Sequence, residues 1–158
     1  MKKVLVTGGA GFIGSNLVKS YIKQGYEVVI VDNLSTGSVD NIPEGVTLFE
    51  EDIRSENFIK ILLNEKPDIV NHHAAQIDVQ LSLSNPVEDA SINILGTMNV
   101  LEGLKQLKQV KDCVLVYASS AAVYGEPHYL GVDEVHPIAP LSFYGASKFT
   151  PEFYIKIY

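Results

Sequence analysis

Apolar runs of strand length alternate along this chain with stretches in which apolar residues recur at helical spacing. Runs such as Val4–Val6 and Val28–Val31 are nearly continuous in branched aliphatic residues, as expected of strands covered on both faces. Such alternation is typical of a parallel α/β sheet. The expected strands are Lys3–Thr7, Glu27–Val31, Thr47–Glu50, Asp68–Asn71 and Lys111–Ala118.

Four segments of helical period separate or follow these strands. They are Phe12–Gln24, Ser55–Glu65, Pro86–Lys108 and Tyr144–Ile157. In the third helix we expect one apolar stripe, formed by Val87, Ala90, Ile94, Leu101 and Leu104. The segment Gly125–Ser142 is rich in Pro and Gly and predicts an ordered loop over the C-terminal edge of the sheet, where ligands of open α/β sheets bind.

The last residues keep a helical pattern and carry no stop signal after it. Five strands are expected where a doubly wound dinucleotide-binding sheet has six. We therefore expect residues 1–158 to be one truncated domain of a longer protein, ending within or just after the helix that begins at Tyr144.

Composition narrows the class of partner. The chain has 158 residues, 46% hydrophobic and 20% charged, with a formal net charge of −7 that argues against a surface for nucleic acid. No apolar run is long enough to cross a membrane or to form the core of a signal peptide. Cys113 is the only cysteine, which rules out an internal disulfide and favours a reducing compartment, so we expect a cytoplasmic protein.

A glycine-rich loop, Gly8–Gly14, directly follows the first expected strand and opens the first expected helix. Glycines at Gly8, Gly11 and Gly14 permit a tight turn, close approach of a pyrophosphate and close packing of the helix on its strand. The anion then rests on free N–H groups at the helix start. A glycine loop alone is weak evidence, but here a strand precedes it and a helix follows.

Asp32 ends the second expected strand, eighteen residues after Gly14. A carboxylate at this place accepts hydrogen bonds from the ribose hydroxyls of NAD and repels the 2′-phosphate of NADP. The alternative is a simple turn residue in Asp32–Ser35. No arginine lies within Asn33–Asp40 to hold a 2′-phosphate, so the sequence predicts NAD binding by a Rossmann-type doubly wound sheet.

Tyr144 and Lys148 lie four residues apart and therefore on one face of a helix. A neighbouring ammonium favours the phenolate form of a tyrosine and makes it a usable base near neutral pH. Ser119 and Ser120 end the fifth expected strand, where a hydroxyl can orient a substrate hydroxyl or simply cap a turn. Together with the glycine loop, this pattern predicts a Ser–Tyr–Lys catalytic set.

These motifs, together with His73-Ala74-Ala75, Asn93 and Ser120–Gly125, resemble in order and spacing the extended short-chain dehydrogenases/reductases, over essentially the whole chain. The resemblance implies that the catalytic residues are Ser120, Tyr144 and Lys148. It also implies that NAD is contacted by Tyr144 and Lys148. The other NAD contacts that it implies are Gly8, Gly11, Phe12, Ile13, Gly14, Asp32, Asn33, Leu34, Ser35, Thr36, Gly37, Asp52, Ile53, His73, Ala74, Ala75, Gln76, Ile77 and Asn93. Phe12 and Ile13 would lie near the pyrophosphate, Asp32–Gly37 around the adenosine ribose, and Asp52 and Ile53 beside the adenine.

Sugar dehydratases of this superfamily carry acidic residues directly after the catalytic hydroxyl residue, because elimination of water needs an additional acid and base. This chain has Ala121 and Ala122 there, which disfavours dehydration. The turn Asp32–Gly37 also resembles that of UDP-glucose 4-epimerases. The resemblance implies an isomerase that oxidises C4 of a UDP-hexose with bound NAD and then reduces it from the opposite face.

Two alternatives stay open at this point: an epimerase of another nucleotide sugar, such as UDP-N-acetylglucosamine, and a non-catalytic NAD-binding module. We expect a homodimer, and no activity from residues 1–158 alone. His72 and His73 have no partner at metal-ligand spacing, so no metal site is predicted. Pro151 falls inside the last expected helix, where it would either kink that helix or begin a new one after Thr150.

Overall fold

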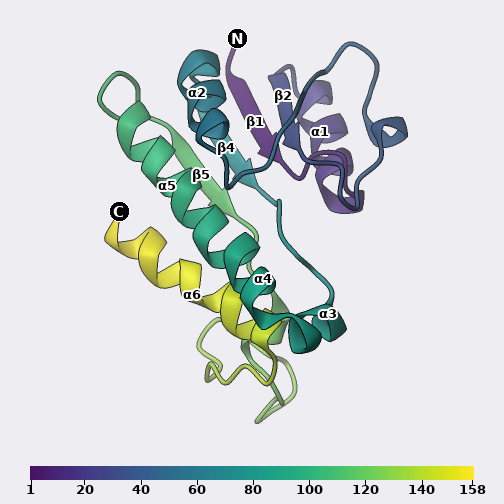
Figure 1. The fold of residues 1–158 in the computed structure, drawn as a ribbon, viewed down its shortest axis with the longest axis vertical. Helices are drawn as coiled ribbons and strands as arrows, with labels where there is room; N and C mark the ends of the chain where they lie inside the picture. The colour runs from purple at the N-terminus through teal and green to yellow at the C-terminus, as the bar shows by residue number, and fades with distance from the viewer. The chain divides into compact units, whose positions relative to one another are not determined.

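The computed structural model describes all residues from Met1 to Tyr158. Five parallel strands form one sheet in the order β3-β2-β1-β4-β5, of which Figure 1 labels β2, β1, β4 and β5. They are β1 (Lys3–Thr7), β2 (Glu27–Asp32), β3 (Thr47–Glu50), β4 (Ile69–His72) and β5 (Val114–Tyr117). This is the strand order of the first five strands of a doubly wound dinucleotide-binding sheet, so the predicted fold class is confirmed.

The chain divides into two compact units. The first, Met1–Ala75 with Asn99–Ala118, holds the whole sheet. The second, Gln76–Met98 with Ser119–Tyr158, contains helices and loops only. The glycine loop and Asp32 therefore belong to the first unit, whereas all three expected catalytic residues belong to the second.

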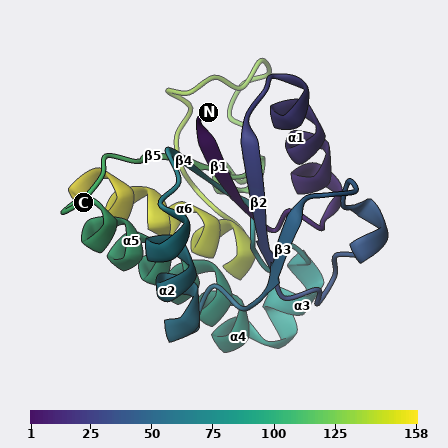
Figure 2. The same cartoon turned by 90° about the horizontal axis from the view of Figure 1, so that it is seen from above.

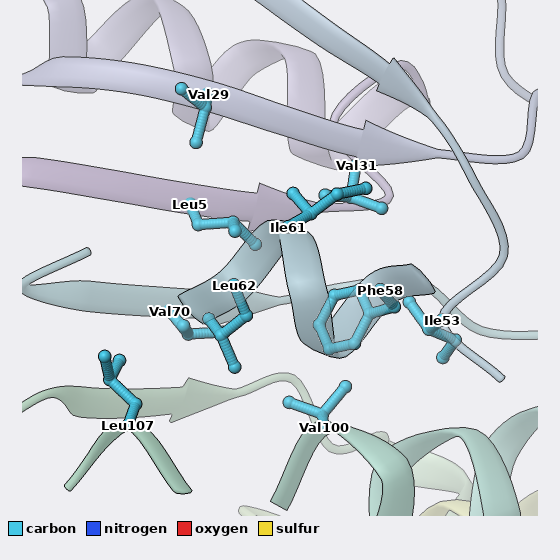
Figure 3. Close-up of a cluster of buried hydrophobic side chains, with 10 residues drawn as sticks. All are labelled: Leu5, Val29, Val31, Ile53, Phe58, Ile61, Leu62, Val70, Val100 and Leu107. Atoms are coloured by element: carbon cyan, nitrogen blue, oxygen red, sulfur yellow. The ribbon is translucent and has the colours of Figure 1, made fainter. Parts of the chain in front are cut away.

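In the first unit both faces of the sheet are covered near its centre, which explains the continuous apolar character of β1 and β2. Helix α1 (Phe12–Lys23) covers one face of the sheet (Figure 2). On this face Val18 packs against Val4, Val6, Val28 and Ile30. On the other face lie α2 (Glu56–Glu65) and the greater part of α5 (Gly96–Leu107). Figure 3 shows the core on that side, formed by Leu5, Val29, Val31, Ile53, Phe58, Ile61, Leu62, Val70, Val100 and Leu107.

Local signals set the ends of these elements. Ser55 caps α2, because its hydroxyl accepts the N–H of Phe58 at 3.0 Å, and Lys66 ends the helix in the left-handed conformation, at φ 46°. A short 3₁₀ turn, η1 (Val39–Asn41), follows β2 and is capped by Ser38. The edge strand β5 leaves Val114 and Val116 60% and 43% exposed. One face of this edge is thus apolar and uncovered within the unit.

The second unit begins with α3 (Val79–Ser84), a helix that the sequence pattern did not predict. Its residues alternate between apolar and polar types, a pattern with strand period. The helix forms because the carboxylate of Asp78 accepts the N–H groups of Gln80 and Leu81 at 2.8 and 3.1 Å. A cap at the helix start therefore outweighs the alternating pattern.

The expected helix Pro86–Lys108 is present as α4 (Pro86–Ala90), a π-helical turn η2 (Ser91–Leu95) and α5. The predicted apolar stripe is wrong at its first residue, since Val87 is 80% exposed, whereas Ala90 and Ile94 are half-buried. The buried side chains there are polar instead, namely Asp89, Asn93 and Thr97, each 2% exposed. The extra residue of a π turn shifts the helix face, and π turns are frequent at functional sites.

The remaining elements of this unit are the 3₁₀ turn η3 (Ala121–Val123) and α6 (Phe143–Ile157). Ser142 caps α6 by accepting the N–H of Gly145 at 3.0 Å. The helix continues through the buried Pro151, so Thr150 does not begin a new helix. Tyr144, Lys148 and Glu152 consequently share one face of one helix.

No helix of the chain combines the length and the apolar character needed to span a bilayer.

Candidate functional site

Three glycines of the loop after β1 are required by packing within the protein. Gly8 has a φ of +70°, and an added methyl group would lie 2.7 Å from the backbone nitrogen of Ala74. A methyl group on Gly9 would meet the side chain of Ile30 at 2.7 Å, and one on Gly14 would lie 2.1 Å from the carbonyl oxygen of Gly8. These glycines let the loop, the start of α1 and the end of β4 pack closely together.

Gly11 is different, and it points to a ligand. Its φ of −76° is open to any residue, and an added methyl group would meet one atom, the Gly8 carbonyl oxygen, in a tight contact of 3.3 Å. Gly11 is also the N-cap of α1, which has no side-chain cap and no acidic residue in its first turn. The first N–H groups of α1 are thus free of side-chain acceptors, and the absence of a side chain at Gly11 fits the approach of a pyrophosphate.

Asp32 holds the glycine loop and the following turn in place. One carboxylate oxygen accepts the N–H of Ala10 at 2.9 Å, and the other accepts the N–H of Leu34 at 2.9 Å, where φ is +56°. Asp32 therefore does act as a turn residue, as the alternative interpretation predicted. Each oxygen keeps a second lone pair for a ribose hydroxyl, so this structural role is compatible with the predicted ligand role.

The turn after β2 is anchored to the same loop. The carbonyl oxygen of Ala10 accepts the N–H of Ser38 at 3.1 Å and the side-chain amide of Asn41 at 2.8 Å. A methyl group on Gly37 would come within 2.8 Å of the Ala10 side chain. Asn33, Ser35 and Thr36 are exposed in this turn, beside the glycine loop.

The ends of β1 and β4 meet at Thr7. Its hydroxyl oxygen lies 2.6 Å from Nδ1 of the buried His72 and accepts the N–H groups of His73 and Ala74 at 3.2 and 3.1 Å. His72 is thus a packed structural residue. No group of three or more His, Cys, Asp or Glu side chains is placed to hold a metal ion. His73, Ala74 and Ala75, the expected cofactor contacts, are half-buried at this strand end.

Asp52 and Ile53, the residues expected beside the adenine, differ in their surroundings. The Arg54 guanidinium beside Asp52 holds the pKa of that carboxyl below its usual range, with an ion pair of 2.8 Å, and Asn33 donates to the same carboxylate at 3.2 Å. Ile53 is 4% exposed and its side chain belongs to the core. Any contact from Ile53 to a ligand would therefore come from its backbone.

In the second unit, Asn93 is the centre of a buried polar network. Its side-chain oxygen accepts the N–H of Gln76 at 2.8 Å, and its side-chain amide donates to the Gln76 carbonyl at 3.1 Å and to Ser147 Oγ at 2.9 Å. The same amide lies 3.3 Å from Oδ1 of Asp89. Asn93 and Gln76 are therefore buried supports, whereas Ile77 is 65% exposed.

Lys148 is almost completely buried on α6, one turn after Tyr144, and only 4% of it is exposed. Burial lowers the pKa of its ammonium to about 8, partly opposed by the negative charges of Asp89 and Glu152. Tyr144 is half-buried. The predicted pair thus lies on one helix face with the lysine enclosed, an environment in which its charge acts strongly on a neighbouring group.

The two serines after β5 have different partners. Ser119 donates its hydroxyl to Glu152 at 2.5 Å. Ser120 caps η3 by accepting the N–H of Ala122 at 3.2 Å, so its hydroxyl proton is still available for a substrate oxygen. This difference supports Ser120 over Ser119 as the substrate-orienting residue.

The sequence interpretation missed the buried residues behind the pair, namely Asp89 and Ser147. A signal for both was present: Asp89 lies four residues before Asn93 on one helix face, and Ser147 lies within the Tyr144–Lys148 motif. Neither could be recognised as buried without the π turn and the packing of α6.

The glycine loop after β1, Asp32 and the Tyr144–Lys148 pair are the features expected of the extended short-chain dehydrogenases/reductases. The family model described as GDP-mannose 4,6 dehydratase matches residues 5–158, and the chain belongs to this family. The expected resemblance to the extended short-chain dehydrogenases/reductases is thereby confirmed.

Sugar epimerases are among the similar proteins within the family. A putative UDP-glucose 4-epimerase of Methanocaldococcus jannaschii is 48% identical over 155 residues, which cover 98% of this chain and 50% of that protein. The chain thus spans about half the length of the curated relatives it matches.

Two solved structures extend this comparison. The UDP-glucose 4-epimerase of Thermus thermophilus in complex with NAD is 42% identical with a TM-score of 0.91, and the match covers 99% of this chain and 50% of that one. The UDP-Glc/GlcNAc 4-epimerase of Campylobacter jejuni is 34% identical with a TM-score of 0.91, and the match covers 99% of this chain and 49% of that one.

Proposed function

We propose that residues 1–158 are the NAD-binding part of a nucleotide-sugar 4-epimerase that interconverts UDP-glucose and UDP-galactose. The observation that carries the proposal is the arrangement of Ser120, Tyr144 and the enclosed Lys148 within one unit of the chain. The similarity to proteins named UDP-glucose 4-epimerase supports it.

The residues fit NAD. The start of α1, which has no side-chain cap, would receive the pyrophosphate at Gly11, and Asp32 would accept the ribose hydroxyls and repel a 2′-phosphate. Bound NAD supplies a reversible hydride acceptor. A solved relative in complex with NAD supports this assignment.

Each catalytic residue has one role in the proposal. Tyr144 removes the proton of the sugar 4-hydroxyl and later returns a proton to the 4-keto oxygen. Ser120 donates its free hydroxyl proton to that same oxygen and orients it. Lys148 stabilises the phenolate form of Tyr144 from one helical turn away.

Dehydration is not favoured, although the family description names a dehydratase. The positions directly after Ser120 are Ala121 and Ala122, which form η3 and offer no proton donor or acceptor. Elimination of water requires such a group. Ala121 and Ala122 therefore favour epimerisation over dehydration for this chain.

A second candidate is an epimerase that also accepts an N-acetylated UDP-hexose. The similarity to the UDP-Glc/GlcNAc 4-epimerase of Campylobacter jejuni is the observation in its favour.

A homodimer in the cytoplasm is part of the proposal. The single cysteine of residues 1–158 favours a reducing compartment.

The test is product analysis with the whole protein that contains these residues. Incubated with UDP-galactose or with UDP-N-acetylgalactosamine, it should release the 4-epimer of the first and, under the second candidate, of both. Tyr144→Phe should reduce kcat by about 10²–10⁴-fold with little change in NAD binding, because it removes a proton-transfer group and little surface. A Tyr144→Phe variant with wild-type turnover would show that another residue is the base.

A further inference from the structure

Asp89 is a buried acid that the proposed mechanism does not use. Only 2% of the residue is exposed. Its Oδ1 accepts the side-chain amides of Gln76 at 2.8 Å and Asn93 at 3.3 Å, whereas its Oδ2 has no hydrogen-bond partner. A buried carboxylate is costly unless hydrogen bonds or a positive charge compensate it. Both side-chain hydrogen bonds are on Oδ1, so no hydrogen bond compensates the burial of Oδ2.

The network around Asp89 reaches α6 next to Lys148. Asn93 donates both to Asp89 and to Ser147 Oγ, the latter at 2.9 Å, and Ser147 directly precedes Lys148. Ser147 in turn donates to the carbonyl oxygen of Tyr144 at 3.0 Å. Asp89 is thus linked through one buried amide to the turn of α6 that carries the catalytic pair.

A nearby negative charge favours the protonated form of the buried Lys148. It is 4% exposed, and burial of an ammonium favours its neutral form. Two acids act on its charge, Asp89 from α4 and Glu152 from α6 itself. Glu152 is half-buried and already accepts the Ser119 hydroxyl at 2.5 Å. Asp89 is the enclosed one of the two, where charges are weakly screened.

We propose that Asp89 is a positioning residue for the Tyr144–Lys148 pair. Its carboxylate fixes Asn93 against the turn of α6 between these residues and supplies the charge that keeps the buried Lys148 protonated. The importance of this for turnover rests on the proposed function, but the charge coupling itself does not.

Asp89→Asn separates these two effects. The Asn side-chain oxygen can still accept from Gln76 and Asn93, and its amide takes the place of the oxygen that has no partner, so the network is kept and only the charge is lost. Glu88→Gln removes the same charge one residue earlier, on a half-buried side chain, and is the matched control.

The first measurement is an NMR titration of the ¹³C-methylated lysines of the whole protein without NAD or substrate, with Lys148 assigned by its loss in Lys148→Met. In Asp89→Asn the pKa of Lys148 should fall from about 8 to about 7 or lower, since a nearby opposite charge is worth about one pKa unit or more. In Glu88→Gln it should stay unchanged. The same pKa in Asp89→Asn and wild type would overturn the proposal.

Turnover gives a second measurement that a purely structural role would not reproduce. At pH 7.5 the protonated fraction of Lys148, and with it turnover, should fall about threefold in Asp89→Asn if its pKa falls from about 8 to about 7. At pH 6 the ratio of variant to wild-type turnover should recover to near one. A loss that is equal at both pH values would contradict the charge role.

If the wild type does not convert any UDP-sugar, the proposed function fails while the titration still decides the role of Asp89. If Asp89→Asn does not fold, as judged by circular dichroism, a crystal structure of the wild-type protein decides. A separation beyond about 10 Å between Lys148 Nζ and the Asp89 carboxylate would overturn the proposal, because charges so far apart are largely screened.

Discussion

Replacing Lys148 by Met should stabilise the fold at neutral pH while it removes the charge that we propose acts on Tyr144. Methionine keeps the length and the apolar stem of lysine but has no ammonium to bury. The pKa of Lys148 is lowered from 10.5 to about 8 by burial, at a side chain only 4% exposed. Each pKa unit corresponds to about 1.4 kcal/mol, so keeping this lysine charged costs the folded state about 3 kcal/mol at pH 7.

The sign of the pH dependence follows from the same shift. Between pH 8 and 10.5 the unfolded chain holds the Lys148 proton and the folded chain has released it, so wild-type stability rises with pH relative to Lys148→Met. The advantage of the variant should be about 3 kcal/mol at pH 7, about 2 kcal/mol at pH 9 and about 1 kcal/mol at pH 10.

Urea unfolding of both proteins at these pH values measures the difference. A surface lysine of α6, changed in Lys156→Met, is the control and should show no such trend. The reasoning would be refuted if Lys148→Met were less stable than wild type at pH 7. It would also be refuted if the stability difference between the two proteins did not change with pH, because the buried ammonium would then not be destabilising.

The remaining predictions concern the cofactor site and the serine pair. Gly14→Ala should destabilise the fold by about 1–3 kcal/mol, since its methyl group would lie 2.1 Å from the carbonyl oxygen of Gly8. Gly11→Ala, whose methyl group would lie 3.3 Å from the same oxygen, should destabilise the fold less and should weaken NAD binding in calorimetry. Equal NAD affinity in wild type and Gly11→Ala would place the pyrophosphate elsewhere. Wild type should bind NAD more tightly than NADP, and Asp32→Asn should lose about 1–3 kcal/mol of NAD binding; tighter binding of NADP by wild type would contradict the role of Asp32. Ser120→Ala should lower kcat about tenfold or more while Ser119→Ala, which loses only a bond to Glu152, should retain most of it.

The sequence by itself determined the sheet and the motifs attached to it. The strands were predictable because parallel strands buried on both faces need continuous apolar runs, and such runs stand out in β1 and β2. The glycine loop, Asp32 and the Tyr144–Lys148 pair were predictable for another reason. Their spacing is set by one local turn or one helix, and local geometry can be derived from the chain alone.

Only the tertiary structure shows which polar residues are buried in the same unit as Tyr144 and Lys148. Asp89 and Asn93 are buried and Val87 is exposed along α4 and the π turn Ser91–Leu95, the reverse of what apolar periodicity indicates. Polar residues of this kind are buried because they satisfy one another across elements distant in the sequence, as Asn93 and Ser147 do. Such pairing has no period, and for that reason the burial of Lys148 and its dependence on Asp89 become visible only in the folded chain.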